Sequence, residues 1–345
     1  MDNKIITVCG PINADSLGVT LTHEHLLIDV RNWLLAPPPG DPFLKNLAVE
    51  KVNIKNRGEL VYYCCYSIDN MHQLDINISI EEALKFKALG GSTIVDLTLD
   101  SIGRNPDGLF NISANTGLNI VMGTGYYVES SWSAEEKGLP VKILADSIVK
   151  EFYEGIGRLK IKPGIIGEIG ISDINNMIEV KGLEAAAIAQ KEIECAINVH
   201  MPIWEKDGHK ILDFLENKKV NLNKVILSHC DPTLDDPDYH DSLAKRGAYI
   251  SYDEFGMELM TPELRFLPSD GERIRAISEQ IRRGNLERIL ISHDIDTKIC
   301  LSNWGGFGYA HILRHIKPRM ENLGVSKEYF DIITIENPKR ILSFC

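Results

Sequence analysis

Two histidines stand one residue apart in the apolar stretch LTHEHLLIDV (residues 21–30). Alternate side chains of a strand point to the same face, so His23 and His25 should lie about 7 Å apart along one face. A single core histidine is usually explained by a hydrogen bond. Two histidines on one buried face favour a bound divalent cation.

Three further candidate ligands end other apolar runs. Glu168 lies near the end of GIIGEIG, His229 ends VILSH, and Asp294 follows His293 in ILISHD. Each alone has a structural interpretation, as an ion pair, a loop contact or a helix cap. Their shared position at predicted strand ends favours a metal site. Mixed nitrogen and oxygen ligands suit Zn, Mn, Fe or Co better than Mg or Ca, and a carboxylate among histidines suggests two neighbouring ions.

Strands of similar composition recur along the chain and must position these residues. Each is a short run rich in Val, Ile, Leu and Thr, which is typical of buried strands. The eight predicted strands are residues 18–25, 92–98, 118–125, 164–170, 200–206, 224–229, 248–253 and 288–294.

Amphipathic helices are predicted between these strands, at residues 80–90, 142–156, 182–197 and 271–283. Alternation of eight strands with helices predicts an α/β fold of the (β/α)8 barrel (TIM barrel) type, in which chemistry lies at the C-terminal ends of the strands. A doubly wound sheet is the alternative, but no glycine-rich phosphate turn follows the first strand.

Residues 31–79 separate the first predicted strand from the first predicted helix. This connection contains PPPG (37–40) and YYCCY (62–66), and it is far longer than ordinary connections. We expect an extended loop over the barrel mouth, which serves either as a partial lid or as packing against the outer helices.

Composition restricts the partners. The chain has 345 residues and a formal net charge of −12, which argues against nucleic acid or an anionic membrane as a partner and leaves a small-molecule substrate. No apolar run approaches the length of a membrane span, and the first residues contain no apolar h-region, so we expect no secretory signal. The seven cysteines show no zinc-type spacing, so we expect reduced thiols and a cytoplasmic protein. We expect residues 1–345 to form one domain, with a homodimer as one alternative for the oligomeric state.

The ordered set of motifs resembles the phosphotriesterase family of the amidohydrolase superfamily, and within it the phosphotriesterase-related proteins. The resembling stretches span nearly the whole chain: TLTHEHLLID (20–29), PGIIGEIGIS (163–172), VILSHCDPT (225–233), SYDEFGMEL (251–259), ISHDIDTK (291–298), GGFGYAHIL (305–313) and ENPKRIL (336–342).

This resemblance implies a metal-dependent hydrolase with one or two divalent ions, zinc first and Mn, Fe or Co as alternatives. His23, His25 and Asp294 would hold the more buried ion, Glu168 would bridge, and His229 would hold the other ion. Asp294 would also be the general base. The expected reaction is cleavage of a carboxylic ester, lactone or acyl amide by activated water, with a phosphoester as a further option.

The fifth strand departs from the family pattern. The family places a histidine four residues after a proline, whereas Lys206 stands four residues after Pro202 here. We therefore expect the second metal to be weakly held or absent. The first expectation is a vacant site with Lys206 as an electrostatic substitute or substrate contact, and the second is Glu205 as a substitute ligand. His200 is assigned a structural role.

Further side chains are candidates for contact with the substrate, and the sequence also allows an alternative function. Tyr127 and Tyr252 follow strands and could wall the substrate pocket. Arg104, Arg273 and Lys298 could meet an anionic substrate, although solvated surface charge is the simpler interpretation. A catalytically impaired relative that binds a small molecule or a phosphosugar is the alternative function, for which NWGGFGY (303–309) leaves some room.

Overall fold

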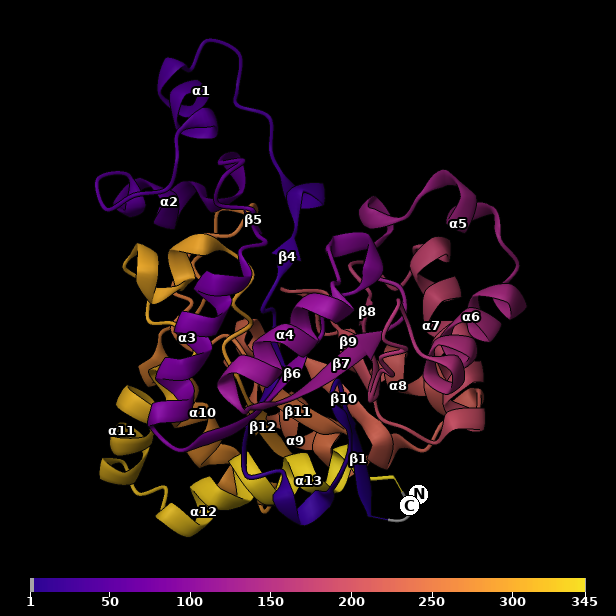
Figure 1. Cartoon of the computed structure of the whole chain (residues 1–345). Coiled ribbons are helices and arrows are strands. Elements are labelled where there is room, and N and C mark those ends of the chain that lie inside the picture. Colours follow the sequence, from indigo (N-terminus) through magenta and orange to yellow (C-terminus); the bar gives the residue numbers. More distant parts are fainter. Residues whose placement is uncertain (1–2, 345) are drawn as a thin grey trace.

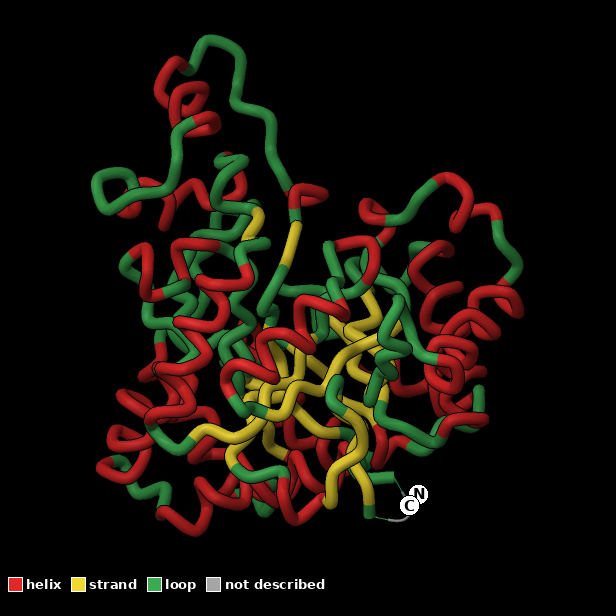
Figure 2. Tube along the Cα trace, viewed as in Figure 1, coloured by secondary structure: helices red, strands yellow, loops and turns green. Residues whose placement is uncertain are grey.

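Eight parallel strands form the centre of the protein, surrounded by helices (Figures 1 and 2). The computed structural model describes residues 3–344. The strands of this sheet are β3 (Val19–Glu24), β6 (Gly91–Asp96), β7 (Asn119–Thr124), β8 (Ile165–Gly170), β9 (Ile197–His200), β10 (Val225–Ser228), β11 (Tyr249–Tyr252) and β12 (Ile289–Ile291).

The first and last strands of this sheet meet, so that the sheet closes. The backbone N–H of His23 donates to Ser292 Oγ at 3.1 Å, and the N–H of Asp294 donates to the His23 carbonyl at 3.2 Å. All neighbouring strand pairs in the sheet are parallel. The prediction of a (β/α)8 barrel is confirmed.

Apolar runs become strands here because both faces of each strand are covered. Every residue of β8 and β10 is buried, which is typical of parallel strands between a barrel interior and an outer layer of helices. Seven of the eight predicted strands coincide with observed strands over several residues, whereas the fifth shares only His200 with β9.

The fifth strand is the exception, and its predicted position was wrong. β9 ends at His200, where the sequence analysis placed its beginning. The preceding helix, α7 (Met177–Ile193), ends at Glu194, which adopts a left-handed conformation with φ of 62°. Because glycine is the usual residue at such an end, the sequence carries no stop signal, and the predicted helix ran into the strand.

Helices follow the strands on the outside of the barrel. The predicted helices correspond to α3 (Ile76–Ala88), α6 (Val141–Glu154), α7 and α10 (Asp270–Arg282). Ser269 and Glu272 form a reciprocal capping box that fixes the start of α10. The other helices are α4 (Pro106–Thr116), α5 (Ala134–Gly138), α8 (Gly208–Asn217), α9 (Pro237–Lys245), α11 (Lys317–Asn322), α12 (Lys327–Asp331) and α13 (Asn337–Leu342).

The long connection after β3 rises above the barrel, where Figure 1 shows α1 (Pro42–Val49) and α2 (Arg57–Tyr63). It is partly helical, and a short antiparallel pair, β4 (Ile28–Asp29) and β5 (His72–Gln73), closes its base. Asp69 ties it to the segment after β12 by an ion pair with Lys298 at 2.9 Å. The connection is therefore anchored over the mouth, as the lid interpretation requires.

The two ends of the described chain meet on the far side of the barrel from this connection (Figure 1). The hairpin of β1 (Lys4–Thr7) and β2 (Gly10–Asn13) lies there, and the Asn3 N–H donates to the Phe344 carbonyl at 3.0 Å. Within residues 3–344, no helix has both the length and the apolar character needed to cross a membrane.

Candidate metal centre and active site

Four side chains from three strand ends converge at the C-terminal end of the barrel. His25 Nε2 lies 3.3 Å from Glu168 Oε1 and 3.0 Å from Asp294 Oδ1. His23 Nε2 lies 3.5 Å from Glu168 Oε2 and 3.4 Å from Asp294 Oδ1. The i, i+2 spacing thus places both imidazoles on one face, and Glu168 and Asp294 face them from β8 and from the residues that follow β12.

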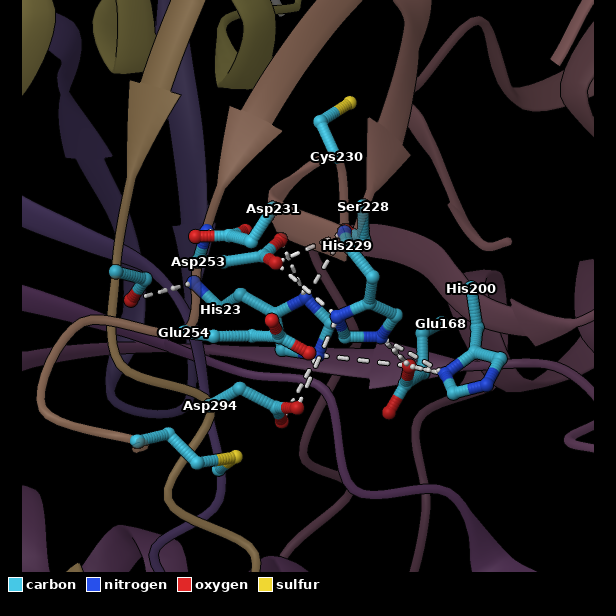
Figure 3. A network of polar contacts seen from close by, with 12 residues as sticks. His23, Glu168, His200, Ser228, His229, Cys230, Asp231, Asp253, Glu254 and Asp294 are labelled. Carbon is cyan, nitrogen blue, oxygen red and sulfur yellow. Dashed lines mark hydrogen bonds and ion pairs between the residues drawn. The ribbon is translucent and has the colours of Figure 1, made fainter. Parts of the chain in front are cut away.

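Two more histidines, His229 and His200, extend this cluster next to Glu168, as Figure 3 shows. His229, directly after β10, has Nε2 at 3.4 Å from Glu168 Oε2. His200, the last residue of β9, has Nδ1 at 2.9 Å from the same oxygen and at 2.8 Å from His229 Nε2. Two ring nitrogens at this distance require a proton or a cation between them, because two lone pairs would repel.

The remaining ring nitrogen of three histidines is occupied by the protein. His25 Nδ1 lies 2.9 Å from Thr98 Oγ1, His23 Nδ1 lies 2.9 Å from Ser228 Oγ, and His229 Nδ1 lies 3.1 Å from Asp253 Oδ1. Such contacts orient each imidazole and direct Nε2 toward the cluster.

Local backbone conformation aims two of these side chains into the barrel. His229 and Asp294 both have positive φ, at 59° and 51°. This left-handed conformation is unfavourable for residues other than glycine, and it persists where the surroundings hold it. The His229 N–H donates to Asp253 Oδ1 at 2.8 Å, while buried Glu24 accepts the N–H groups of His293 and Ile295 on either side of Asp294.

The electrostatic environment attracts positive charge. Burial by itself would lower the pKa of His23, but the carboxylates of Glu168, Asp294 and Asp253 outweigh burial and raise this pKa to about 10. Burial and the neighbouring His229 lower the pKa of His200, which favours a neutral imidazole able to act as a ligand.

The donor atoms fit a divalent cation. His23 Nε2 and Asp294 Oδ1 are buried and have no hydrogen-bond partner in the protein. A buried polar atom without a partner is costly, and a metal ion would satisfy both atoms. Three sets of ligand atoms lie within 4.8 Å of one another: His23, His25, Glu168 and Asp294; Glu168, His200 and His229; and His23, His229 and Asp253.

A cavity of about 320 Å³ opens on this cluster. His25, Glu168, His200 and Asp294 lie in its wall, so their ligand atoms are accessible to a small molecule. The long connection after β3 contributes Trp33 and other residues, which confirms its expected place at the barrel mouth. An accessible metal-binding cluster at the base of a largely apolar cavity is the arrangement of a catalytic site.

Comparison with known proteins agrees with this geometry. The sequence model described as "Phosphotriesterase family" matches residues 3–342. The N-acetyltaurine hydrolase of Salmo salar is 35% identical over 348 residues, covering 100% of this chain and 99% of that protein. The chain belongs to the phosphotriesterase family.

Other relatives of this family member extend the comparison. The human N-acetyltaurine hydrolase is 34% identical over 351 residues, covering 100% of this chain and 99% of that protein. A resiniferatoxin-binding protein from Rhodobacter sphaeroides superposes with a TM-score of 0.96 at 38% identity, covering 99% of this chain and 95% of that chain. The phosphotriesterase homology protein of Escherichia coli superposes with a TM-score of 0.79 at 27% identity, covering 95% of this chain and 100% of that chain. The prediction of a hydrolase of the phosphotriesterase family is confirmed.

The structure ends the fifth strand at a different residue from the one that the sequence analysis expected. Lys206 does not lie at the end of the fifth strand, because that strand ends six residues earlier, at His200. Lys206 is exposed and pairs with Asp236 at 2.8 Å, while Glu205 lies in the cavity wall. The structural role assigned to His200 was therefore based on a misplaced strand.

The two tyrosines have different surroundings. Tyr127 lines the cavity, and its hydroxyl lies 3.5 Å from His200 Nδ1. Tyr252, contrary to expectation, lies outside the cavity. It is fully buried in β11, and its hydroxyl lies 2.9 Å from His240 Nδ1, because its position on the strand turns it into the protein core.

Sequence reasoning missed three buried residues that belong to this cluster or contact it. Asp253 follows β11 directly, so the strand-end rule that found Asp294 could have found it. Glu24 stands between the two histidines and is completely buried, which the alternation of strand side chains does not reveal. His200 could have been found only by recognising that α7 stops at Glu194.

Proposed function

We propose that this protein is a metal-dependent hydrolase that cleaves a carboxylic ester, lactone or acyl amide. The observation that carries the proposal is the convergence of buried nitrogen and oxygen ligand atoms at the base of an accessible cavity. Mixed imidazole and carboxylate ligands favour zinc, with Mn, Fe or Co as alternatives.

The ligand assignment follows from the distances. His23, His25 and Asp294 would hold one ion, and His200 and His229 would hold a second ion. Glu168 presents Oε1 toward His25 and Oε2 toward His200, so its carboxylate would bridge both ions. We therefore propose that each chain binds two metal ions.

When bound, such ions lower the pKa of a coordinated water and polarise the carbonyl group of the substrate. Asp294 is suited to accept the proton from the attacking water, because its side chain is 13% exposed, toward the cavity, and it has a second carboxylate oxygen besides Oδ1, which faces the two imidazoles. The same carboxyl group would then return the proton to the leaving group. Tyr127, at the cavity wall beside His200, would orient the substrate.

An amide is the bond that the relatives favour. The relatives in Salmo salar and human are called N-acetyltaurine hydrolases, and they match the chain over its full length. We propose an acyl amide as the first substrate class, ahead of esters and lactones.

Metal analysis and turnover test this proposal together. Dialysed protein should contain two equivalents of transition metal, and it should hydrolyse members of a panel of acyl amides, esters and lactones. Asp294→Asn should keep the fold and lose turnover by about 10²–10⁴-fold, the range expected for a positioned general base. Protein without metal that gains no activity on addition of Zn or Mn would refute the proposal.

A small-molecule binding protein is the second candidate function. The likeness to a resiniferatoxin-binding protein, with a TM-score of 0.96, and the largely apolar cavity favour it. In that case a ligand of the cavity would raise the Tm of the metal-loaded protein, whereas no compound of the panel would be turned over.

We also propose a cytoplasmic location. The cysteines at positions 9, 64, 65, 195, 230 and 300 are all free thiols, which is the usual state in a reducing compartment. Fractionation of the source cells tests this location, and light scattering tests the homodimer.

A further inference from the structure

The cavity wall beyond the metal centre is mostly apolar. Trp33 and Tyr127 lie on one part of this wall, and Trp204, Leu259 and Met260 come from the segments after β9 and β11. Trp33 and Tyr127 pack edge to face with ring centroids 6.5 Å apart. These side chains would contact the part of a substrate that lies away from the cleaved bond.

The charged groups in the wall, apart from the metal-binding cluster, are all acidic. Glu254 and Asp296 lie deep in the cavity, and Glu205 and Glu263 are exposed at its rim. Among residues 3–344, no lysine or arginine lines the cavity. An anion bound in the cavity would therefore meet acidic side chains and aromatic rings, without a lysine or arginine as its partner.

Three basic side chains that are close in sequence to wall residues do not line the cavity. Lys206 pairs with Asp236 at 2.8 Å, and Lys298 pairs with Asp69 at 2.9 Å. Arg265 lies over the ring of Trp204, with 3.8 Å between the guanidinium carbon and the ring centroid. All three remain outside the cavity wall.

The deepest arginine is also neutralised. Arg273 is fully buried behind the cavity, with Nε at 2.6 Å from Asp231 Oδ1 and NH2 at 3.7 Å from Glu254 Oε2. Three carboxylates, those of Asp231, Glu254 and Asp270, surround this single guanidinium. Arg273 therefore has no capacity left to bind an anionic substrate.

We propose that the cavity selects an apolar substrate whose part remote from the cleaved bond is neutral or positively charged. An anion would lose its hydration without gaining an ion pair, and the exposed carboxylates of Glu205 and Glu263 at the rim would repel it. This inference rests on the proposed hydrolysis at the metal centre. N-acetyltaurine would therefore be a poor substrate of this protein. Two carbon atoms separate its sulfonate from the amide nitrogen, so the sulfonate would lie against this cavity wall when the amide lies at the metal centre.

A matched series of amides tests the selection. Three amines of similar length are joined to one acyl group: taurine, which is anionic; ethylenediamine, which is cationic; and butylamine, which is neutral. The series is made once with acetyl and once with benzoyl groups. We expect kcat/KM for the neutral and cationic amides to exceed that for the taurine amide at least tenfold.

Binding to Asp294→Asn separates this inference from the proposed function. In this variant the three amides are compared by calorimetry without turnover, with metal loaded. One outcome is that the variant binds the taurine amide at least tenfold more weakly than the other amides while the wild type hydrolyses none of them. This result would refute the proposed function and support the proposed selection. Equal or tighter binding of the taurine amide, or no binding of any amide, would overturn the selection even where hydrolysis occurs.

Charge-reversing substitutions at the cavity rim test whether the acidic wall causes the preference against the taurine amide. Glu205→Lys and Glu263→Lys each place a cation at the cavity mouth, and each should raise kcat/KM for the taurine amide about three- to tenfold relative to the neutral amide. Glu135→Lys makes the same change on exposed α5, outside the cavity wall, and should leave this ratio unchanged. An equal change in all three variants would show that net charge, and not the wall, sets the preference.

Discussion

Replacing His200 with alanine tests which residue of the fifth strand serves the metal centre. His200 Nδ1 lies 2.9 Å from Glu168 Oε2 and 2.8 Å from His229 Nε2, so these three atoms would surround one ion. Alanine removes one of three protein ligands. We expect His200→Ala to bind one metal ion per chain in place of two.

The expected magnitude follows from this count of ligands. Loss of a residue that only orients a ligand lowers metal affinity about 10–100-fold, so loss of a ligand itself should cost at least about 100-fold. This corresponds to about 2.8 kcal/mol, at about 1.4 kcal/mol per tenfold change. The second ion should therefore leave during dialysis, while the first ion, held by His23, His25 and Asp294, should stay.

Elemental analysis of dialysed protein and competition with a chromogenic chelator measure this change. Lys206→Ala is the matched control, because Lys206 makes only an exposed ion pair with Asp236, which is worth about 0–1 kcal/mol. Two tightly bound ions in His200→Ala, or loss of one ion in Lys206→Ala, would refute the assignment of the fifth-strand ligand.

Three other predictions concern the stability of the fold. Arg273→Met leaves three buried carboxylates without their cation, and should lower the free energy of unfolding in urea by about 3–5 kcal/mol; exposed Arg275→Met should change it by less than about 1 kcal/mol. Burial would raise the pKa of Asp69, but hydrogen bonds from Lys51 and Lys298 outweigh it and lower the pKa to about 2. Since this value lies below the unfolded pKa of about 3.9, the Asp69 carboxylate stabilises the fold above about pH 4, and this contribution is lost as the pH falls toward 2. The difference in unfolding free energy between wild type and Asp69→Asn should therefore shrink from pH 5 to pH 2, and a constant difference would contradict the ion-pair account. Chelation of the metal should lower Tm, and metal restored at 100 times its Kd should add about 2.7 kcal/mol of stability; an unchanged Tm would show that the cluster binds no metal in the folded protein.

The barrel was predictable because its strands are buried on both faces. Such strands are continuous apolar runs, and a polar residue at their end is conspicuous in the sequence. His23, His25, Glu168, His229 and Asp294 were selected on this basis, and the structure brings all five together. The two-residue period of strands and the shared direction of parallel strands were sufficient to predict these five residues of the site.

The fifth strand was not predictable in the same way. Its four residues, INVH, follow the helical sequence of α7 without glycine or proline between them. The helix stops at Glu194, which adopts a left-handed conformation although it is not a glycine, the residue type that usually indicates such a helix end. A short strand without boundary signals therefore hid the ligand at its end.

Buried acidic residues behind the site were missed for a different reason. Glu24 and Asp253 make hydrogen bonds to backbone N–H groups and to His293 and His229, and these partners lie on other strands. Such pairs join positions far apart in the chain. The sequence shows that these residues are acidic, but no local pattern reveals which distant groups stabilise their buried carboxylates.

The closure of the barrel between β3 and β12 also determines when the metal centre can exist. During synthesis His23 and His25 leave the ribosome early, and Asp294 follows only after nearly the whole barrel has been made. The Asp294 N–H must then reach the His23 carbonyl before the carboxylate faces the two imidazoles. A chain that lacks its last strand would carry most of the ligands without the complete site. Loading with metal would therefore be one of the last events in the maturation of this protein.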